Sequence, residues 1–274
     1  MPNNSPIGIF DSGVGGLSVL RAMQAQMPAE EIIYFGDQAH VPYGPRPLDE
    51  VCAFSEEITR FLLAKNAKLI VVACNSASAA ALPYLRATFP HMQFVGMEPA
   101  IKPAVEHTRS GVVGVLATPA TFQGALYASV LERFARGVTV LQHTCTGLVE
   151  QIEKGALDAP ETESILRDAL TPMLAQGIDT VVLGCTHYPF VIPLIQKIVG
   201  EDVRVIDPSP AVARQVGRLL DAGGLRHAER QSAPRTFYSS RAAEFESVLP
   251  VLLGQVAAVN EIDWEDRTLR VRMI

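Results

Sequence analysis

The chain has 274 residues, 48% hydrophobic and 19% charged, which excludes a largely disordered protein and allows one large domain or two ordinary ones. Its net charge is −6 and no basic run exceeds two residues, so nucleic-acid binding has little electrostatic support. The opening residues lack a basic segment followed by an apolar core, and no stretch approaches about 18 apolar residues, so we expect a cytoplasmic protein without a secretory signal or membrane span.

Short β-branched segments alternate with longer amphipathic segments along the chain. The predicted strands are Ile7–Phe10, Ile32–Phe35, Leu69–Ala73, Phe94–Gly96, Val112–Leu116, Val138–Leu141, Thr180–Leu183, Val203–Ile206, Thr236–Tyr238 and a last one near Ala258–Ile262. The predicted helices include Leu17–Met27, Asp49–Ala64, Ala77–Ala87, Phe122–Ala135, Thr162–Ala175 and Ala211–Ala222. This alternation predicts an α/β fold whose mostly parallel sheets are covered by helices, with a site at the carboxyl ends of the strands.

A weak internal repeat relates the two halves of the chain. IGIFDSG and LIVVACNSASA in the first half correspond to VVGVLATPAT and DTVVLGCTHYP in the second, at similar spacing. Each half reads as a strand, a polar turn, a long gap, a second strand and a cysteine. Two similar lobes would each place one cysteine at a strand end, facing a shared cleft.

The first of these cysteines, Cys74, follows the predicted strand Leu69–Ala73 and stands at the start of a helix that Asn75 or Ser76 could cap. Free N–H groups and positive potential at a helix N-terminus lower the pKa of a thiol, so we expect a reactive Cys74. The alternative is a buried structural cysteine, which is the commoner fate of a lone cysteine.

The motif GCTHYPF repeats this design around Cys185. Gly184 permits a close backbone approach, Thr186 and His187 follow the cysteine, and Pro189 could begin a helix. His187 could orient or deprotonate a group near Cys185, or it could be a structural histidine. Two such turns at equivalent places favour a functional role for both cysteines.

The remaining two cysteines, Cys52 and Cys145, lack that setting, and we interpret them as structural or as merely near the site. All four are far apart and form no CxxC pair, so a zinc site or a thioredoxin-like site is disfavoured and reduced thiols are expected.

Two further turns carry polar groups. IGIFDSGVGGLSVL places Asp11 and Ser12 between a strand and a helix, and it matches neither a Walker A loop nor GxGxxG. Its N–H groups could hold a carboxylate and Asp11 could pair with an ammonium, or the segment could be a capping turn. YFGDQAHVPYGPRP offers the N–H groups of Tyr43 and Gly44, but not of Pro42, to an anion, or it is a plain surface turn.

These segments, together with GVLATPATF and GLVEQIEKG, resemble glutamate racemase of the aspartate/glutamate racemase superfamily, from about Ile7 to beyond Pro210. FDSGVGGLSVL, PYG, ACNSASA and GCTHYP occur in the order typical of that family. Two departures stand out: Ser76 replaces the usual Thr, and the stretch from Cys145 to Gly147 differs from the family's usual Cys-Pro stretch.

The resemblance implies two α/β lobes, one of residues 1–96 plus about 208–274 and one of about 97–207, with the active site between them. It implies interconversion of L- and D-glutamate without a metal or other cofactor, with Cys74 exchanging the proton of D-glutamate and Cys185 that of L-glutamate. It further implies a homodimer that supplies D-glutamate for bacterial peptidoglycan synthesis. The residues expected to assist the thiols are Asp11, Glu150 and His187. Those expected to bind the substrate are Asp11, Ser12, Pro42, Tyr43, Gly44, Asn75, Ser76, Thr118, Thr121, Thr186 and His187.

The implied reaction fits the two cysteines chemically. A racemase must remove the α-proton from one face of the carbon and return one to the other, which two opposed bases achieve without moving the substrate. A pyridoxal enzyme would need a Schiff-base lysine, and no lysine stands in a strand-end loop that suggests one. Two alternatives stay open: an aspartate or hydantoin racemase, which would share both cysteines, and an amino-acid sensor, which would need neither.

Overall fold

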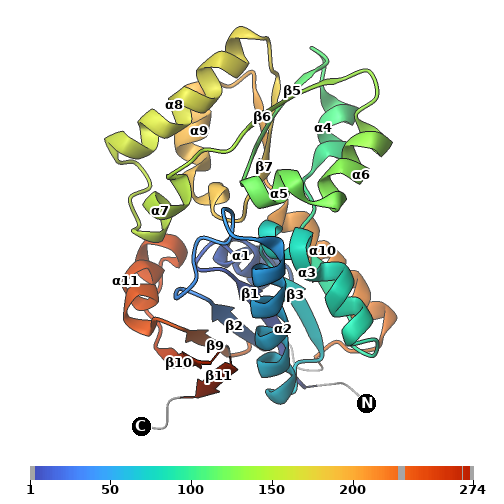
Figure 1. Ribbon diagram of the computed structural model, residues 1–274, viewed down its shortest axis with the longest axis vertical. Helices are drawn as coiled ribbons and strands as arrows, with labels where there is room; N and C mark the ends of the chain where they lie inside the picture. Colours follow the sequence, from blue (N-terminus) through green and yellow to red (C-terminus); the bar gives the residue numbers. More distant parts are fainter. Residues whose placement is uncertain (1–3, 228–231, 267, 272–274) are drawn as a thin grey trace.

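The computed structural model describes residues 4–227, 232–266 and 268–271, and two sheets organise this part of the chain (Figure 1). The helices that cover the sheets are α1 (Leu17–Gln26), α2 (Leu48–Ala64), α3 (Asn75–Thr88), α4 (Ile101–His107), α5 (Pro119–Gln123), α6 (Ala125–Phe134), α7 (Leu148–Glu153), α8 (Pro160–Ala175), α9 (Ile192–Val199), α10 (Ser209–Ala222) and α11 (Ala242–Leu253), with a 3₁₀ turn at Tyr188–Val191. No helix among the described residues is long and apolar enough to cross a membrane.

The larger sheet has seven strands in the order β11-β10-β9-β2-β1-β3-β4. All its pairings are parallel except that of β10 with β11. Its strands are β1 (Ile7–Asp11), β2 (Ile32–Gly36), β3 (Leu69–Val72), β4 (Phe94–Gly96), β9 (Arg235–Ser239), β10 (Val259–Glu265) and β11 (Thr268–Val271).

The smaller sheet has four parallel strands in the order β6-β5-β7-β8. They are β5 (Val112–Ala117), β6 (Thr139–His143), β7 (Thr180–Gly184) and β8 (Arg204–Ile206). This order matches the order β2-β1-β3-β4 in the larger sheet, so the predicted repeat is confirmed. Cys74 follows β3 and Cys185 follows the equivalent strand β7.

The predicted fold class is therefore correct: two mostly parallel sheets, each covered by helices. Strands of the larger sheet come from 7–96 and 235–271, and those of the smaller sheet from 112–206. The lobe boundaries near 96/97 and 207/208 stay a prediction, and residues 1–3, 228–231, 267 and 272–274 of the first lobe lie outside the described residues.

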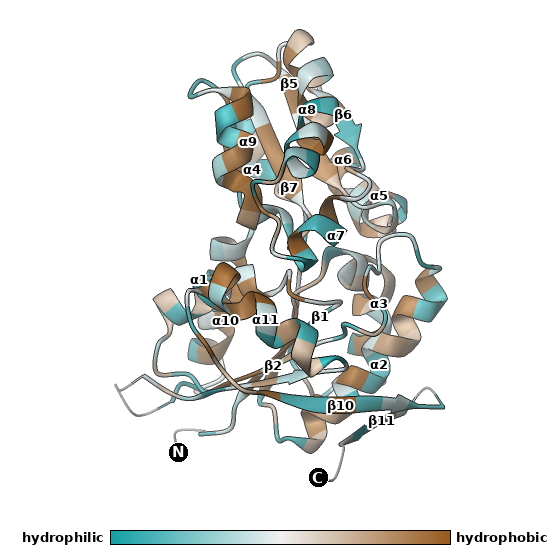
Figure 2. Ribbon diagram, turned by 90° about the vertical axis from the view of Figure 1, so that its left-hand side faces the viewer, coloured by the Kyte–Doolittle hydropathy of each residue, from teal (hydrophilic) through white to brown (hydrophobic). Residues whose placement is uncertain are grey.

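Alternating residues of the buried strands pack into two different hydrophobic clusters, one on each face of the larger sheet. Ile9 and Val71 face a cluster shared with α1, α8, α9 and α10, whereas Phe10 and Val72 face the cluster under α2 and α3. The first cluster also contains Leu183 of the smaller sheet, so one continuous apolar core joins the two sheets. Figure 2 shows the central strands and the inner sides of the helices in hydrophobic colours. Each large side chain buried in this way contributes about 1.5–3 kcal/mol to folding.

One predicted helix is divided in the structure. The segment expected as Phe122–Ala135 is two helices, α5 and α6, because Gly124 is extended (φ −68°, ψ 136°). A Cβ at Gly124 would lie 2.6 Å from the Cβ of Ala79 in α3. The chain therefore turns where the two lobes touch. The helices α4, α7 and α11 and the antiparallel strand β11 were not among the predicted elements, whereas the helix suggested at Pro189 is the 3₁₀ turn that leads into α9.

A buried ion pair joins the two segments that lead into β2 and β3 of the larger sheet. Lys68 Nζ lies 2.7 Å from Glu30 Oε2, and the two side chains are only 1% and 3% exposed. We expect Glu30→Gln to lower the free energy of unfolding by about 3 kcal/mol, because it leaves a buried ammonium without its countercharge. Urea unfolding measures this loss. Glu163→Gln, which breaks the exposed pair with Arg167, is the matched control and should change stability little. Equal losses in the two variants would contradict the prediction.

Candidate functional site

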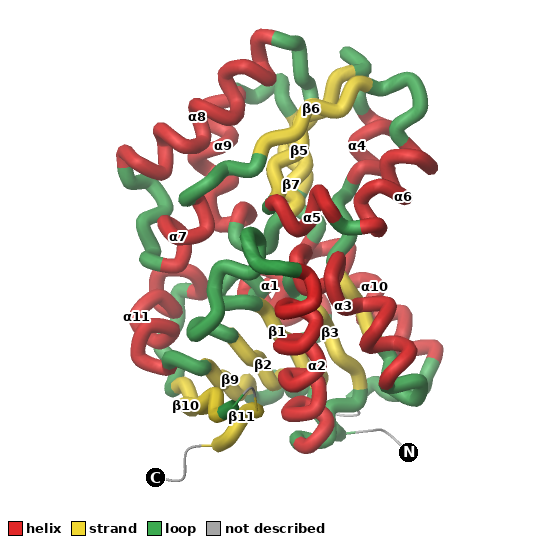
Figure 3. Tube along the Cα trace, in the orientation of Figure 1, coloured by secondary structure: helices red, strands yellow, loops and turns green. Residues whose placement is uncertain are grey.

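The carboxyl ends of both sheets face one pocket between the lobes. The loops that follow the strands gather there, between the two sheets (Figure 3). The residues lining the pocket are Ser12, Pro42, Tyr43, Gly44, Cys74, Asn75, Ser76, Thr118, Val149, Cys185, Thr186 and His187. All except Val149 were singled out from the sequence. The structure thus places both predicted cysteine turns in a single site.

Cys74 begins α3 and is buried. Its Sγ accepts a hydrogen bond from the N–H of Ala77 (3.5 Å), so Cys74 itself caps the helix and the expectation of an Asn75 or Ser76 cap is wrong. Burial raises the pKa of the Cys74 thiol, and the nearby charge of Asp11 raises it further. We predicted that the helix N-terminus would lower this pKa, and this prediction is wrong because burial outweighs the effect of the helix. Cys74 is held as a neutral thiol.

Cys185 belongs to a chain of three polar side chains. Its Sγ lies 3.7 Å from Nδ1 of His187, and Nε2 of His187 lies 2.5 Å from Oε1 of Glu153. Burial of the ring acts to lower the pKa of His187, but hydrogen bonds to Cys185 and Glu153 outweigh it, and the pKa lies well above its usual range. A positively charged imidazole beside Sγ stabilises a thiolate. Glu153 and Cys185 thus lie on opposite sides of the His187 ring, each within hydrogen-bond distance of one ring nitrogen.

Glu153 was missed in the sequence, where Glu150 was chosen instead. Oε1 of Glu153 also accepts the N–H of Val14 (2.9 Å), and its Oε2 accepts Nε2 of Gln38 (2.8 Å). Glu150 lies one turn earlier in α7 and is exposed. The structure therefore brings Glu153, rather than Glu150, to His187. The GLVEQIEKG segment places both glutamates on one helical face, so the sequence alone does not show which of them contacts His187.

Asp11 is completely buried at the end of β1. It accepts the N–H of Gly13 and the hydroxyl of Thr186, both at 2.9 Å, so it links the larger lobe to the loop of Cys185. Burial raises the pKa of Asp11, and the charge of His187 opposes this rise. Asp11 does not line the pocket itself but lies directly behind residues that do.

A hydroxyl chain crosses between the lobes on the other side of the pocket. Ser76 Oγ lies 2.8 Å from Oγ1 of Thr118, which lies 3.0 Å from Oγ1 of Thr121. Both atoms of the Asn75 side-chain amide are buried without a hydrogen-bond partner. Unsatisfied buried amides are rare and costly, so this one marks a position where a polar ligand group would be bound.

The site is nearly closed. Its free volume is about 10 Å³, which is roughly the space of one water molecule. An amino acid can enter only if the lobes separate. None of the four cysteines is in a disulfide, and the described residues contain no group of three or more His, Cys, Asp or Glu side chains that could hold a metal ion.

Known proteins share both this sequence and this fold. The Asp/Glu/Hydantoin racemase family matches residues 7–216. A glutamate racemase of Roseiflexus sp. is 54% identical over 220 residues, which cover 80% of this chain and 81% of the relative.

Two solved structures are also similar. A glutamate racemase isoform of Bacillus anthracis superimposes with a TM-score of 0.85 at 34% identity, covering 94% of this chain and 97% of that one. The glutamate racemase of Francisella tularensis, in complex with D-glutamate, has a TM-score of 0.82 at 30% identity, covering 95% and 98%. With a family match over most of its length and these relatives, the chain belongs to the Asp/Glu/Hydantoin racemase family.

Proposed function

We propose that this chain interconverts L- and D-glutamate by proton transfer between Cys74 and Cys185, without a cofactor. The observation that carries the proposal is the presence of two cysteines, each after an equivalent strand of a repeated sheet, in one closed pocket. The names of the relatives, and the D-glutamate bound to the Francisella protein, support glutamate as the substrate.

In the proposed reaction one cysteine takes up a proton and the other releases one. With L-glutamate, the Cys185 thiolate takes the α-proton, the electron pair remains on the α-carbon next to the carboxylate, and the Cys74 thiol delivers its proton to the opposite face. The two cysteines have then exchanged protonation states, which suits them to D-glutamate. The thiol form of Cys74 and the positive His187 beside Cys185 fit the start of the L-to-D direction.

Recognition of the substrate uses the polar wall of the pocket. The free amide of Asn75 and the hydroxyls of Ser76 and Thr118 offer donors for carboxylates, whereas Thr186 gives its hydroxyl proton to Asp11 and can accept a hydrogen bond from the ammonium group. Closing the lobes over the substrate excludes water, which strengthens these hydrogen bonds in the carbanion-like state. Thr121 acts through Thr118, and Asp11 acts through Thr186.

The cellular setting is proposed with the reaction. D-glutamate made in the cytoplasm would supply peptidoglycan synthesis, and the protein would act as a homodimer. Gel filtration with light scattering at enzyme-assay concentrations tests the dimer, and a monomeric mass for the active protein would contradict it.

The reaction itself is tested by α-proton exchange. We expect each glutamate enantiomer to incorporate deuterium at the α-carbon in D₂O, without added cofactor and after dialysis against a chelator. Nuclear magnetic resonance follows the exchange, and chiral chromatography follows the product. Activity that disappears on dialysis and returns only with metal would contradict a cofactor-independent mechanism.

Glutamate should be strongly preferred to aspartate. Donors placed to hold both carboxylates of glutamate would leave either the distal carboxylate or the α-carbon of aspartate, which is one methylene shorter, out of position, and we expect kcat/KM to fall by about 100-fold. Chiral chromatography with each amino acid as sole substrate measures the ratio. Comparable values would assign the chain to a different substrate within the family.

A further inference from the structure

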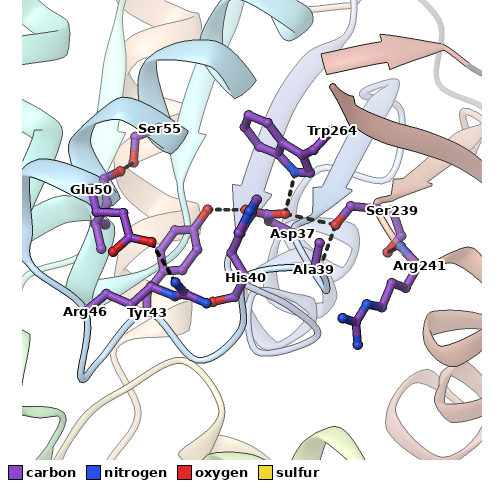
Figure 4. Close-up of polar contacts among 12 residues, drawn as sticks. Asp37, Ala39, His40, Tyr43, Arg46, Glu50, Ser55, Ser239, Arg241 and Trp264 are labelled. Atoms are coloured by element: carbon purple, nitrogen blue, oxygen red, sulfur yellow. Dashed lines mark hydrogen bonds and ion pairs between the residues drawn. The ribbon is translucent and has the colours of Figure 1, made fainter. Parts of the chain in front are cut away.

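A buried carboxylate outside the pocket joins distant parts of the chain. Asp37 directly follows β2 and is fully buried. Its Oδ1 accepts the indole N–H of Trp264 (2.8 Å) and the hydroxyl of Ser240 (2.9 Å). Its Oδ2 accepts the phenol of Tyr43 (2.7 Å) and lies 2.8 Å from Nδ1 of His40. Figure 4 shows the Tyr43 and Trp264 side chains converging on Asp37. These four partners compensate the burial of a charge, which would otherwise be costly.

One partner of Asp37 belongs to the pocket. Tyr43 lies in the segment 42–44, here called the substrate loop, which lines the site. Burial, followed by the charge of Asp37, raises the pKa of the Tyr43 phenol well above its usual range, so the hydroxyl stays a donor. The bond to Asp37 therefore fixes the ring from which the loop extends. The same loop meets the other lobe, because the carbonyl of Gly44 accepts the N–H of Ala120 (3.0 Å).

A second partner of Asp37, Trp264, comes from a distant part of the chain. Trp264 lies on β10, next to the edge of the larger sheet, and its ring packs edge-on against His40 (4.9 Å between centroids). His40 in turn stacks on Phe54 of α2 at 4.0 Å. Trp264 thus donates a hydrogen bond to Asp37, and its ring packs against His40, which also contacts Asp37. Neither Trp264 nor Asp37 lines the pocket.

We propose that Asp37 is a positioning residue for the substrate loop, and that β10 supports substrate binding through the chain Trp264–Asp37–Tyr43. The inference rests on the proposed function, because it counts the substrate loop as part of the glutamate site. It assigns β10 a role in holding substrate in addition to its place in the sheet.

The test compares two losses of a hydrogen bond from the same strand. Trp264→Phe removes the indole donor to Asp37 and keeps an aromatic ring. Asn260→Ala is the matched control, because Nδ2 of Asn260 donates to the carbonyl of Phe237 (2.9 Å) and does not reach Asp37. We expect Trp264→Phe to raise KM for both glutamate enantiomers by about 3- to 10-fold with a smaller change in kcat, and Asn260→Ala to leave both constants within about 1.5-fold.

A double-mutant cycle then separates a specific link from general weakening of the fold. In the Tyr43→Phe background the loop is already released from Asp37, so adding Trp264→Phe should raise KM much less than it does in the parent. Assays are run below the thermal midpoint of every variant. Ser240→Ala, which removes the second donor to Oδ1, repeats the comparison if Trp264→Phe folds poorly.

Equal KM values for Trp264→Phe and Asn260→Ala, or fully multiplicative effects in the cycle, would overturn the inference. A parent protein that does not racemise glutamate would contradict the proposed function instead. In that case calorimetric Kd values for D-glutamate on the same variants decide whether Asp37 positions the loop.

Discussion

Replacing either Cys74 or Cys185 by serine should reduce glutamate racemisation by at least about 1,000-fold. A hydroxyl is far less acidic than a thiol, so it neither accepts the α-proton as an anion nor returns one efficiently near neutral pH. Losing one base stops the full reaction, because a proton must leave one face and arrive on the other. Chiral chromatography after long incubation measures the residual rate. The control variants are Cys52→Ser and Cys145→Ser, which should stay within a few-fold of the parent.

The two serine variants should differ only in partial reactions. Because L- and D-glutamate are equally stable, the Haldane relation forces kcat/KM to fall equally in both directions of racemisation. Elimination from 3-chloroglutamate needs one base: the thiolate takes the α-proton, chloride leaves with the Cβ–Cl electron pair, and the enamine hydrolyses to 2-oxoglutarate and ammonium. Cys185→Ser, which keeps Cys74, should process the D-configured substrate, and Cys74→Ser the L-configured one. The same enantiomer preference in both variants would exclude a two-base mechanism.

The strands, the internal repeat and the placement of the two cysteines could be predicted from the sequence because they depend on local patterns, whereas the order of strands in each sheet was not predicted. Buried parallel strands such as β3 and β7 read as apolar runs, and the polar residues after them are forced to the same sheet edge. The repeat in the amino-acid sequence corresponds to the equivalent strand orders β2-β1-β3-β4 and β6-β5-β7-β8 in the two sheets. The turns that carry Cys74, Thr118 and Cys185 could therefore be assigned to one shared pocket from the sequence.

Other features depend on contacts between residues that are distant in the chain, and local sequence patterns do not reveal these contacts. The pKa of Cys74 is set by burial between two lobes, which outweighs the helix terminus that the sequence reveals. The choice of Glu153 over Glu150 depends on where α7 docks against Val14 and Gln38. The break at Gly124 depends on contact with α3 from the other lobe. The contact of Trp264 with Asp37 joins residues that are far apart in the sequence and depends on the place of β10 in the sheet.

Glu153→Gln should be far more damaging than Glu150→Gln, although the two glutamates lie one turn apart. Both Cys185 and Glu153 raise the pKa of His187, and glutamine keeps the shape of residue 153 but removes its charge, so this pKa should fall and racemisation should decrease by about 100-fold. Because a lower pKa means that His187 loses its proton at lower pH, the alkaline limb of the pH–kcat/KM profile should move to lower pH. Elimination from L-configured 3-chloroglutamate, which uses Cys185, should suffer more than elimination from the D-form. Glu150→Gln should keep the parent profile because its side chain is exposed. The opposite ranking, with Glu150→Gln the more impaired variant, would show that the contact between Glu153 and His187 does not support Cys185.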